Sequence, residues 1–202
     1  MKRHERLLIV FSKNPVAGLV KTRLAASIGA AEALLVYEEL RMITEKVTAA
    51  ADCTRTVFYS DYIPEEDLFL NGSTDAHLQD GADLGERIHR AFLKGFGLGF
   101  RQVVLIGTDC PELSSFLVDS AFDALDGHDA VIGPARDGGF YLVGLNRPLP
   151  ELFLGRKWST PEVLRESLRI IRERKMELAI LPALSDIDTV DDLMESGLWD
   201  PN

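Results

Sequence analysis

An aspartate follows directly after a strongly apolar stretch in the middle of the chain. Residues 103–106 are all aliphatic, and the next five residues are Gly107, Thr108, Asp109, Cys110 and Pro111. A β-branched apolar run that stops in this way is typical of a buried strand with an abrupt end. Ligands of open α/β sheets lie outside the carboxyl ends of the strands, so Asp109 is well placed to hold a metal or a substrate. Alternatively, Asp109 only caps the helix that follows.

Three cations surround the first loop of the chain. Lys13, Lys21 and Arg23 lie around a glycine, Gly18, between an apolar run and a helical pattern. Backbone N–H groups at a helix start favour anions, lysine adds a point charge, and arginine adds a bidentate fork. The turn lacks the Walker spacing and the three glycines of a dinucleotide fingerprint. A phosphate site and a solvated charged rim are therefore both open interpretations.

Two glycine-containing stretches offer further contacts to a ligand. Gln79 and Gly81 precede a helix, where an amide could read a base edge or the stretch could simply open that helix. Asp137 is followed by Gly138 and Gly139 just before an apolar strand, so a ligand could approach the backbone closely there. Asp137 is also the candidate general base, because an acceptor hydroxyl needs a carboxylate or an imidazole within reach. A tight loop between strands explains Asp-Gly-Gly equally well.

A second acidic pair lies near the end of the sequence. Thr189 and Asp192 resemble a capping box, which gives Asp192 a structural role at the last helix. Asp186 and Asp188 precede that helix and have no such role. They are candidates to meet Asp109 across the sheet.

The overall composition argues against several classes of protein. A formal net charge of -10 and a pI near 4.9 argue against a nucleic acid partner, because that affinity depends on clustered lysine and arginine. The apolar run at residues 7–11 is too short for a signal peptide or a membrane span, so we expect a cytoplasmic protein without a membrane partner. Cys53 and Cys110 are expected to be buried thiols. The oligomeric state stays open.

An alternation of strands and helices must position these residues. With 202 residues, 46% of them hydrophobic, the chain can fill the core of one domain, which we place at residues 1–202. Strands are predicted at residues 6–11, 54–59, 103–106, 129–132, 140–143 and 177–182. Helices are predicted at residues 22–51, with an interruption near Gly29, and at residues 114–125. A third helix is predicted to begin after an Asp83 cap and to stop at the glycines of 95–99. A fourth is predicted from a Thr160 cap and Pro161 to residue 175, and a last one after Thr189. Residues 61–75 are assigned to a polar connection. Continuously apolar strands indicate a parallel sheet that is buried on both faces.

Five motifs together resemble a known family. They are Lys21-Thr22-Arg23-Leu24, Gly107-Thr108-Asp109-Cys110-Pro111, Asp137-Gly138-Gly139-Phe140, Trp158-Ser159-Thr160 and Asp186-Ile187-Asp188-Thr189. Over nearly its whole length the chain is similar to the bacterial GT-A-type glycosyltransferase-like family. That family is related to nucleotide-diphospho-sugar transferases and includes members assigned to arsenosugar biosynthesis. Each motif is weak alone, and their preserved order carries the resemblance.

The resemblance implies a three-layer α/β/α fold with a mostly parallel central sheet, and Mg²⁺ or Mn²⁺ between the nucleotide and the acceptor. It implies that Asp109 and Asp188 hold the metal and that the cations of the first loop face the diphosphate. Gln79 and Gly81 fall where the wider superfamily meets the base. The expected substrate site comprises Lys13, Gly18, Lys21, Arg23, Gln79, Gly81, Thr108, Gly138 and Gly139, with Asp109 and Asp137 as catalytic residues. The usual D-x-D motif has a single carboxylate here, so Asp188 or Asp186 would have to complete the metal site.

The predicted function is metal-dependent glycosyl transfer from a nucleotide-diphospho-sugar to a small-molecule acceptor. The first alternative is nucleotidyl transfer from a nucleoside triphosphate with release of pyrophosphate, as in molybdenum-cofactor and 2-phospholactate guanylyltransferases. Those enzymes resemble the chain at residues 21–24 and at Asp188-Thr189. The second alternative is a non-catalytic sensor of a nucleotide or metabolite. Fold alone does not decide among the three.

Overall fold

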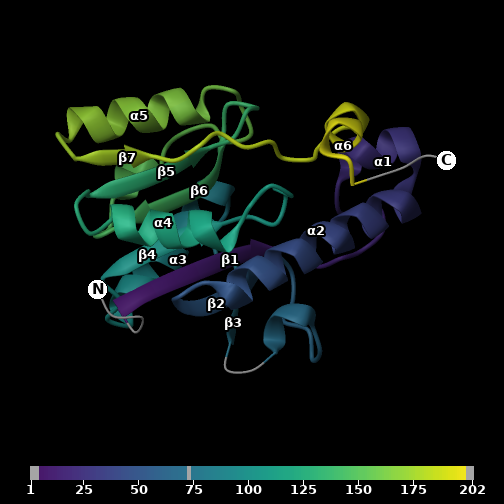
Figure 1. The fold of residues 1–202 in the computed structure, drawn as a ribbon, viewed down its shortest axis with the longest axis horizontal. Coiled ribbons are helices and arrows are strands. Elements are labelled where there is room, and N and C mark those ends of the chain that lie inside the picture. The colour runs from purple at the N-terminus through teal and green to yellow at the C-terminus, as the bar shows by residue number, and fades with distance from the viewer. Residues whose placement is uncertain (1–4, 72–73, 199–202) are drawn as a thin grey trace.

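The computed structural model describes residues 5–71 and 74–198, in which helices cover both faces of a central sheet (Figure 1). The seven strands described form one sheet in the order β3-β2-β1-β4-β6-β5-β7. They are β1 (Arg6–Ser12), β2 (Thr54–Tyr59), β3 (Asp75–Leu78), β4 (Gln102–Ile106), β5 (Ala130–Pro134), β6 (Phe140–Leu145) and β7 (Leu178–Ile180). Neighbouring strands are parallel except where β6 pairs with β4 and β5. The predicted α/β fold with a mostly parallel sheet is confirmed.

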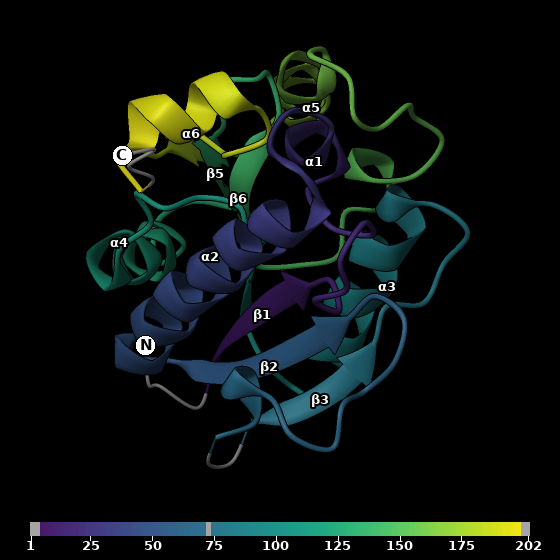
Figure 2. The ribbon, with the colours of Figure 1, turned by 90° about the vertical axis from the view of Figure 1, so that its right-hand side faces the viewer.

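The helices divide between the two faces of the sheet. They are α1 (Thr22–Ile28), α2 (Ala30–Ala50), α3 (Leu84–Gly97), α4 (Ser115–Ala124), α5 (Val163–Glu173) and α6 (Val190–Ser196), with short 3₁₀ turns η2 (Leu68–Leu70) and η3 (Pro150–Leu152). Helices α2 and α4 pack on one face, and α3 and α5 pack on the other (Figure 2). Helices α1 and α6 lie together beyond the carboxyl end of β1 and share a small core with α2. None of these described helices is both long and apolar enough to cross a membrane.

Strand β1 shows why the sheet needs cover on both sides. Leu8 and Val10 face the α2/α4 layer, whereas Leu7 and Ile9 face the α3/α5 layer. All four side chains are at most 3% exposed. A continuously apolar strand therefore buries both of its faces, as parallel strands between two helical layers do.

The predicted helix starts are confirmed at two helices that a side chain caps. Asp83 accepts a hydrogen bond from the amide of Glu86 at the start of α3, and Thr189 and Asp192 form the predicted capping box of α6. Gly29 separates α1 from α2, as expected. The two cysteines are buried and form no disulfide with each other.

The predicted start of α5 is wrong by two residues. The helix begins at Val163, and neither Thr160 nor Pro161 opens it. Leu164 donates its backbone amide to the carbonyl of Gly138 at 2.8 Å. A neighbouring loop thus satisfies an amide of the first turn, which the expected threonine cap would otherwise do.

One further element prediction is confirmed and another needs correction. The glycines of 95–99 end α3 as predicted, since the helix stops at Gly97 and Gly99 has a positive φ of 92°. Gly95 lies where a Cβ would press on Leu7 and Val103, so the glycine lets the helix approach the sheet closely. The connection predicted at residues 61–75 contains η2, and Asp75 already belongs to the edge strand β3, whose residues are exposed or only partly buried.

Candidate functional site

A cleft of about 390 Å³ opens at the carboxyl ends of β1 and β4. The strand order reverses between these two strands, since β2 and β3 continue on the far side of β1. Such a switch point leaves a crevice that α/β proteins use for ligands. Lys13 follows β1, while Thr108 and Asp109 follow β4, and all three line the cleft.

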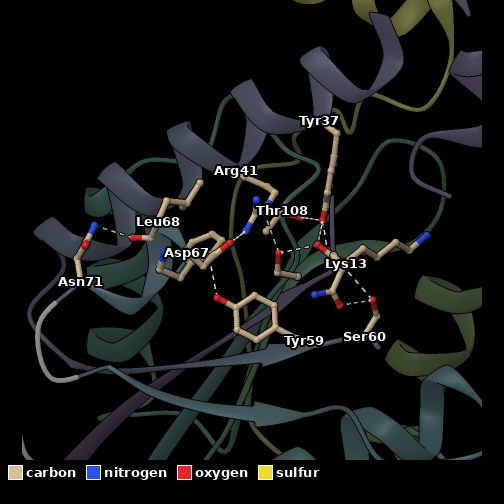
Figure 3. Close-up of polar contacts among 12 residues, drawn as sticks. Lys13, Tyr37, Arg41, Tyr59, Ser60, Asp67, Leu68, Asn71 and Thr108 are labelled. Carbon is tan, nitrogen blue, oxygen red and sulfur yellow. Dashed lines mark hydrogen bonds and ion pairs between the residues drawn. The ribbon is translucent and has the colours of Figure 1, made fainter. Parts of the chain in front are cut away.

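The hydroxyl of Tyr37 joins the two strand ends beneath the cleft (Figure 3). It accepts a hydrogen bond from the Lys13 amide at 2.8 Å, donates to the Lys13 carbonyl at 3.2 Å, and lies 3.1 Å from the Thr108 hydroxyl. Burial raises the pKa of Tyr37, and the charge of Asp109 adds to that rise. The phenol therefore stays neutral and fixes the backbone from which the Lys13 side chain extends.

Lys21 is the buried cation of the site. Its side chain is 4% exposed, and its ammonium forms an ion pair with Asp109 and lies 3.4 Å from Asp188 Oδ1. Burial lowers the pKa of Lys21, but the two carboxylates outweigh burial and leave the pKa above its ordinary value. The residue has a left-handed backbone, with φ of 47°, directly before α1. Such a conformation is uncommon in a lysine, and the ammonium contacts Asp109 and Asp188 of the cleft wall without itself lining the cleft.

Arg23 lies at the outer side of the same acidic group. One of its guanidinium nitrogens is 3.5 Å from Asp188 Oδ2, and its side chain is 71% exposed. The short helix α1 has no capping side chain and only seven residues. The cationic side chains, more than the helix start, therefore set the positive charge of this loop.

The segment that carries Asp186 and Asp188 is attached to the end of β4 by a backbone contact. The amide of Ile187 donates to the carbonyl of Asp109 at 3.0 Å. Ala135 forms an isolated bridge with Leu184 immediately before it. The expected meeting of the acidic pair with Asp109 is thus present in the geometry. Asp109 does not cap the following helix, since Ser114 caps α4.

The carboxylates of the site carry more negative charge than Lys21 neutralises. Burial, followed by the charges of Asp109 and Asp137, raises the pKa of Asp186 to about 7. A site crowded with carboxylate oxygens has the hard donors that Mg²⁺ and Mn²⁺ prefer. The donor chemistry therefore fits a divalent cation. Among the described residues no three such side chains are spaced as a ligand set, and the ammonium of Lys21 is paired with both Asp109 and Asp188.

The far side of the cleft is formed by the hairpin between β5 and β6. Asp137 lines the cleft and accepts a hydrogen bond from the amide of Gly139 at 2.8 Å. Gly138 has φ of +93° and packs on the backbone of Pro161, where a Cβ would overlap. Gly138 thus supports the loop, whereas Asp137 and Gly139 face the cleft.

The remaining predicted residues divide between the cleft and its surroundings. Gln79 lines the cleft, but its amide nitrogen donates to the carbonyl of Phe58 at 3.0 Å. Gly81 packs against the backbone of Arg87, and Gly18 lies in open space. Neither glycine is part of the cleft lining.

Several cleft residues escaped the sequence reasoning. Tyr37 lies inside a helical pattern, where a tyrosine is expected to be a core residue. Phe140 and Trp158 also line the cleft, although both belonged to motifs of the family resemblance. Their position in those motifs was the signal that could have found them.

Comparisons with known proteins agree with this fold. A family model described as an uncharacterized protein conserved in bacteria, DUF2064, matches residues 43–160. A crystal structure from Desulfovibrio desulfuricans G20, provisionally named a nucleotide-diphospho-sugar transferase, has 33% identity and a TM-score of 0.88, with 94% of this chain and 85% of that chain covered. No protein of curated function matches the sequence.

Two more distant structures, each determined with a bound ligand, share the fold. CMP:2-keto-3-deoxy-manno-octonic acid synthetase, complexed with CTP, has 11% identity, a TM-score of 0.59, and 95% of this chain and 96% of that chain covered. The Rv0371c protein of Mycobacterium tuberculosis H37Rv, in complex with manganese, has 13% identity, a TM-score of 0.56, and 94% and 96% covered. At these identities the similarity concerns the fold.

Proposed function

The chain belongs to the DUF2064 family of bacterial proteins, and for this member we propose metal-dependent glycosyl transfer from a nucleotide-diphospho-sugar to a small-molecule acceptor. The observation that carries the proposal is the meeting of Lys21 with Asp109 and Asp188 at the β1/β4 switch point. A group of cations beside carboxylates suits a diphosphate that binds together with a divalent metal. The provisional name of the D. desulfuricans structure supports the same donor class.

The cations of the first loop would hold the donor. Lys13 extends from the end of β1 into the cleft, and Lys21 and Arg23 approach from the start of α1. Their charges compensate the charge of a diphosphate in a protein whose formal net charge is -10. A local cationic group is sufficient, because exposed charges farther away than about 10 Å are largely screened at moderate ionic strength.

Asp109 and Asp188 would hold the metal once Lys21 moves from between them. When bound, Mg²⁺ or Mn²⁺ neutralises the negative charge that builds on the departing diphosphate. The manganese complex of the M. tuberculosis protein supports this choice of cation on the same fold.

Asp137 is proposed to receive the proton of the acceptor hydroxyl. In the reaction the acceptor oxygen bonds to the sugar carbon, the bond from that carbon to the diphosphate breaks, and the hydroxyl proton passes to a carboxylate. Asp137 lines the cleft at the β5–β6 hairpin, and it also lines a neighbouring hollow with Arg23 and Asp188. The test of this role is Asp137→Asn, which should lower transfer while nucleotide binding persists. Full transfer activity in that variant would exclude Asp137 as the base.

Nucleotidyl transfer is the second candidate. Three cations at one turn would also suit a triphosphate, and the CTP-bound synthetase shares the fold. A single experiment separates the two reactions: the protein is incubated with Mg²⁺ and either nucleoside triphosphates or nucleotide-sugars. Release of a nucleoside diphosphate from a sugar donor supports glycosyl transfer. Release of pyrophosphate from a triphosphate overturns it in favour of nucleotidyl transfer.

The metal role is tested by Mn²⁺ binding in the presence of a nucleoside diphosphate. Asp109→Ala should abolish binding at the site, while Glu65→Ala, which removes an exposed carboxylate in a loop, should leave it unchanged. Unchanged Mn²⁺ binding by Asp109→Ala would contradict the assignment.

A further inference from the structure

The cleft has one charged side and one apolar side. The charged side carries Lys13 and the carboxylates of Asp109, Asp186 and Asp188. The apolar side carries Leu84 and Ile88 from α3, Phe140 from β6, and Trp158 from the segment before α5. Ligand pockets of this mixed kind hold an apolar surface against hydrophobic groups and orient it with a few polar ones.

Trp158 is held in one orientation by contacts around its ring. Its indole nitrogen donates to the carbonyl of Phe153 at 3.2 Å. The guanidinium of Arg156 lies 5.2 Å from the centre of its ring, and Phe140 meets it edge to face, with centroids 6.0 Å apart at 86°. A Cβ on Gly85 would overlap the indole nitrogen, so α3 also presses on its edge. A ring that is already fixed loses little conformational freedom when a ligand stacks on it.

Polar groups lie next to this aromatic pair. Ser159 and Thr160 follow Trp158 directly and line the same cleft, and Ser159 has a left-handed backbone with φ of 58°. Asp137 approaches from the hairpin, whose Gly138 packs on Pro161. Hydroxyls and a carboxylate beside an aromatic surface suit a ring that has an apolar face and a hydroxyl-bearing edge. A sugar ring has this chemistry.

The strand order places this wall beyond the phosphate-binding residues. Lys13 follows β1, Asp109 follows β4, and Phe140 begins β6, which is the next strand of the sheet. A donor with its nucleotide on the β1 side and its diphosphate at Asp109 would therefore direct its sugar toward Phe140 and Trp158.

We propose that Trp158 is the platform on which the sugar ring of the donor stacks, with the perpendicular ring of Phe140 beside it, and that Trp158 determines affinity for the sugar ring. The inference rests on the proposed glycosyl transfer and adds the position of the transferred group to it. Trp158 is a binding residue here and takes no part in proton transfer.

The test compares nucleoside diphosphates with their sugar conjugates by calorimetry in Mn²⁺. The matched probes are UDP and UDP-glucose, GDP and GDP-mannose, and ADP and ADP-glucose. Trp158→Leu should weaken binding of the sugar conjugate about tenfold, the size of a lost stacking contact, and leave binding of the bare diphosphate unchanged. Trp158→Phe should retain most of the affinity for the conjugate. Phe116→Leu, at an aromatic residue of α4 that is 76% exposed, is the control and should change neither.

The possible outcomes test the sugar platform and the proposed function separately. If Trp158→Leu weakens the bare diphosphate and the conjugate equally, or weakens neither, the platform is refuted and glycosyl transfer stands. If the wild-type protein binds none of the six probes, glycosyl transfer itself is refuted. Unchanged binding of the bare diphosphate also shows that Trp158→Leu is folded.

Discussion

The buried ion pair of Arg41 and Asp67 provides a quantitative test of the structure. The two side chains are 3% and 8% exposed, and they join α2 to the turn before η2 (Figure 3). Asp67 also accepts hydrogen bonds from the Tyr59 hydroxyl at 2.6 Å and from the Phe69 amide at 3.1 Å. Arg41 donates through Nε to the hydroxyl of Ser12 at 3.2 Å. Both charges are largely shielded from bulk water, so each depends on its partners.

Removing one partner leaves the other charge buried without its counterion. Arg41→Met and Asp67→Leu should each lower the free energy of unfolding by about 3 to 5 kcal/mol. The double variant should lose much less than the sum, because no uncompensated charge remains. Its loss should be about 2 to 3 kcal/mol, which corresponds to the hydrogen bonds that Asp67 makes to the Tyr59 hydroxyl and the Phe69 amide.

Urea denaturation of the four proteins measures this coupling. Midpoint and slope give the free energy of unfolding for each variant. The exposed pair of Arg169 and Glu173, with side chains 61% and 60% exposed, is the control, and Arg169→Met should change stability by less than about 0.5 kcal/mol. Additive losses from Arg41→Met and Asp67→Leu would refute the reasoning, since they would mean that the charges do not depend on each other.

Three further predictions concern backbone strain, capping and pH. Gly138→Ala should destabilise the fold by about 1 to 3 kcal/mol because its Cβ would overlap Pro161, and Gly18→Ala, at a similar φ in open space, should lose less in thermal denaturation. Thr189→Ala should lower the free energy of unfolding, measured by urea denaturation, by about 1 kcal/mol through loss of the α6 cap. An unchanged free energy of unfolding would show that the cap does not stabilise the protein. Burial lowers the pKa of His77 below 6.5, so its contribution to stability is present above pH 6.5 and is lost as the pH falls. His77→Gln should therefore flatten the dependence of the urea midpoint on pH between about 7 and 5, and an unaltered slope would contradict this.

The central strands and the capped helix starts could be predicted because local sequence determines them. Residues 103–106 are an aliphatic run typical of a buried strand, and residues 54–59 are rich in the β-branched and aromatic side chains that favour strands. Thr189 and Asp192 cap a helix through residues three apart. Strand β3 could not be predicted, since two of its four residues are exposed, two are only partly buried, and their strand conformation depends on pairing with β2. The start of α5 depends likewise on a carbonyl of Gly138, far away in sequence.

The acidic and basic residues of the cleft could be named from the sequence, but their pairing could not. The ion pairs of Lys21 depend on a left-handed backbone at that residue and on the Ile187 amide, which attaches the Asp186–Asp188 segment to Asp109. Trp158 appeared in a motif, yet its ring is a cleft wall only because α3 and β6 press on it from elsewhere in the chain. Such contacts between distant segments exist only in the folded protein.

The antiparallel direction of β6 gives the two sides of the cleft different evolutionary freedom. Parallel strands need long crossovers, so the segments after β1 and β4 are tied to helices that also build the core. The β5–β6 hairpin turns at the same edge within residues 135–139, and no helix lies between its two strands. If the protein is a glycosyltransferase as proposed, changes at hairpin positions other than Gly138, which packs on Pro161, would alter acceptor recognition while the residues after β1 and β4 stay intact.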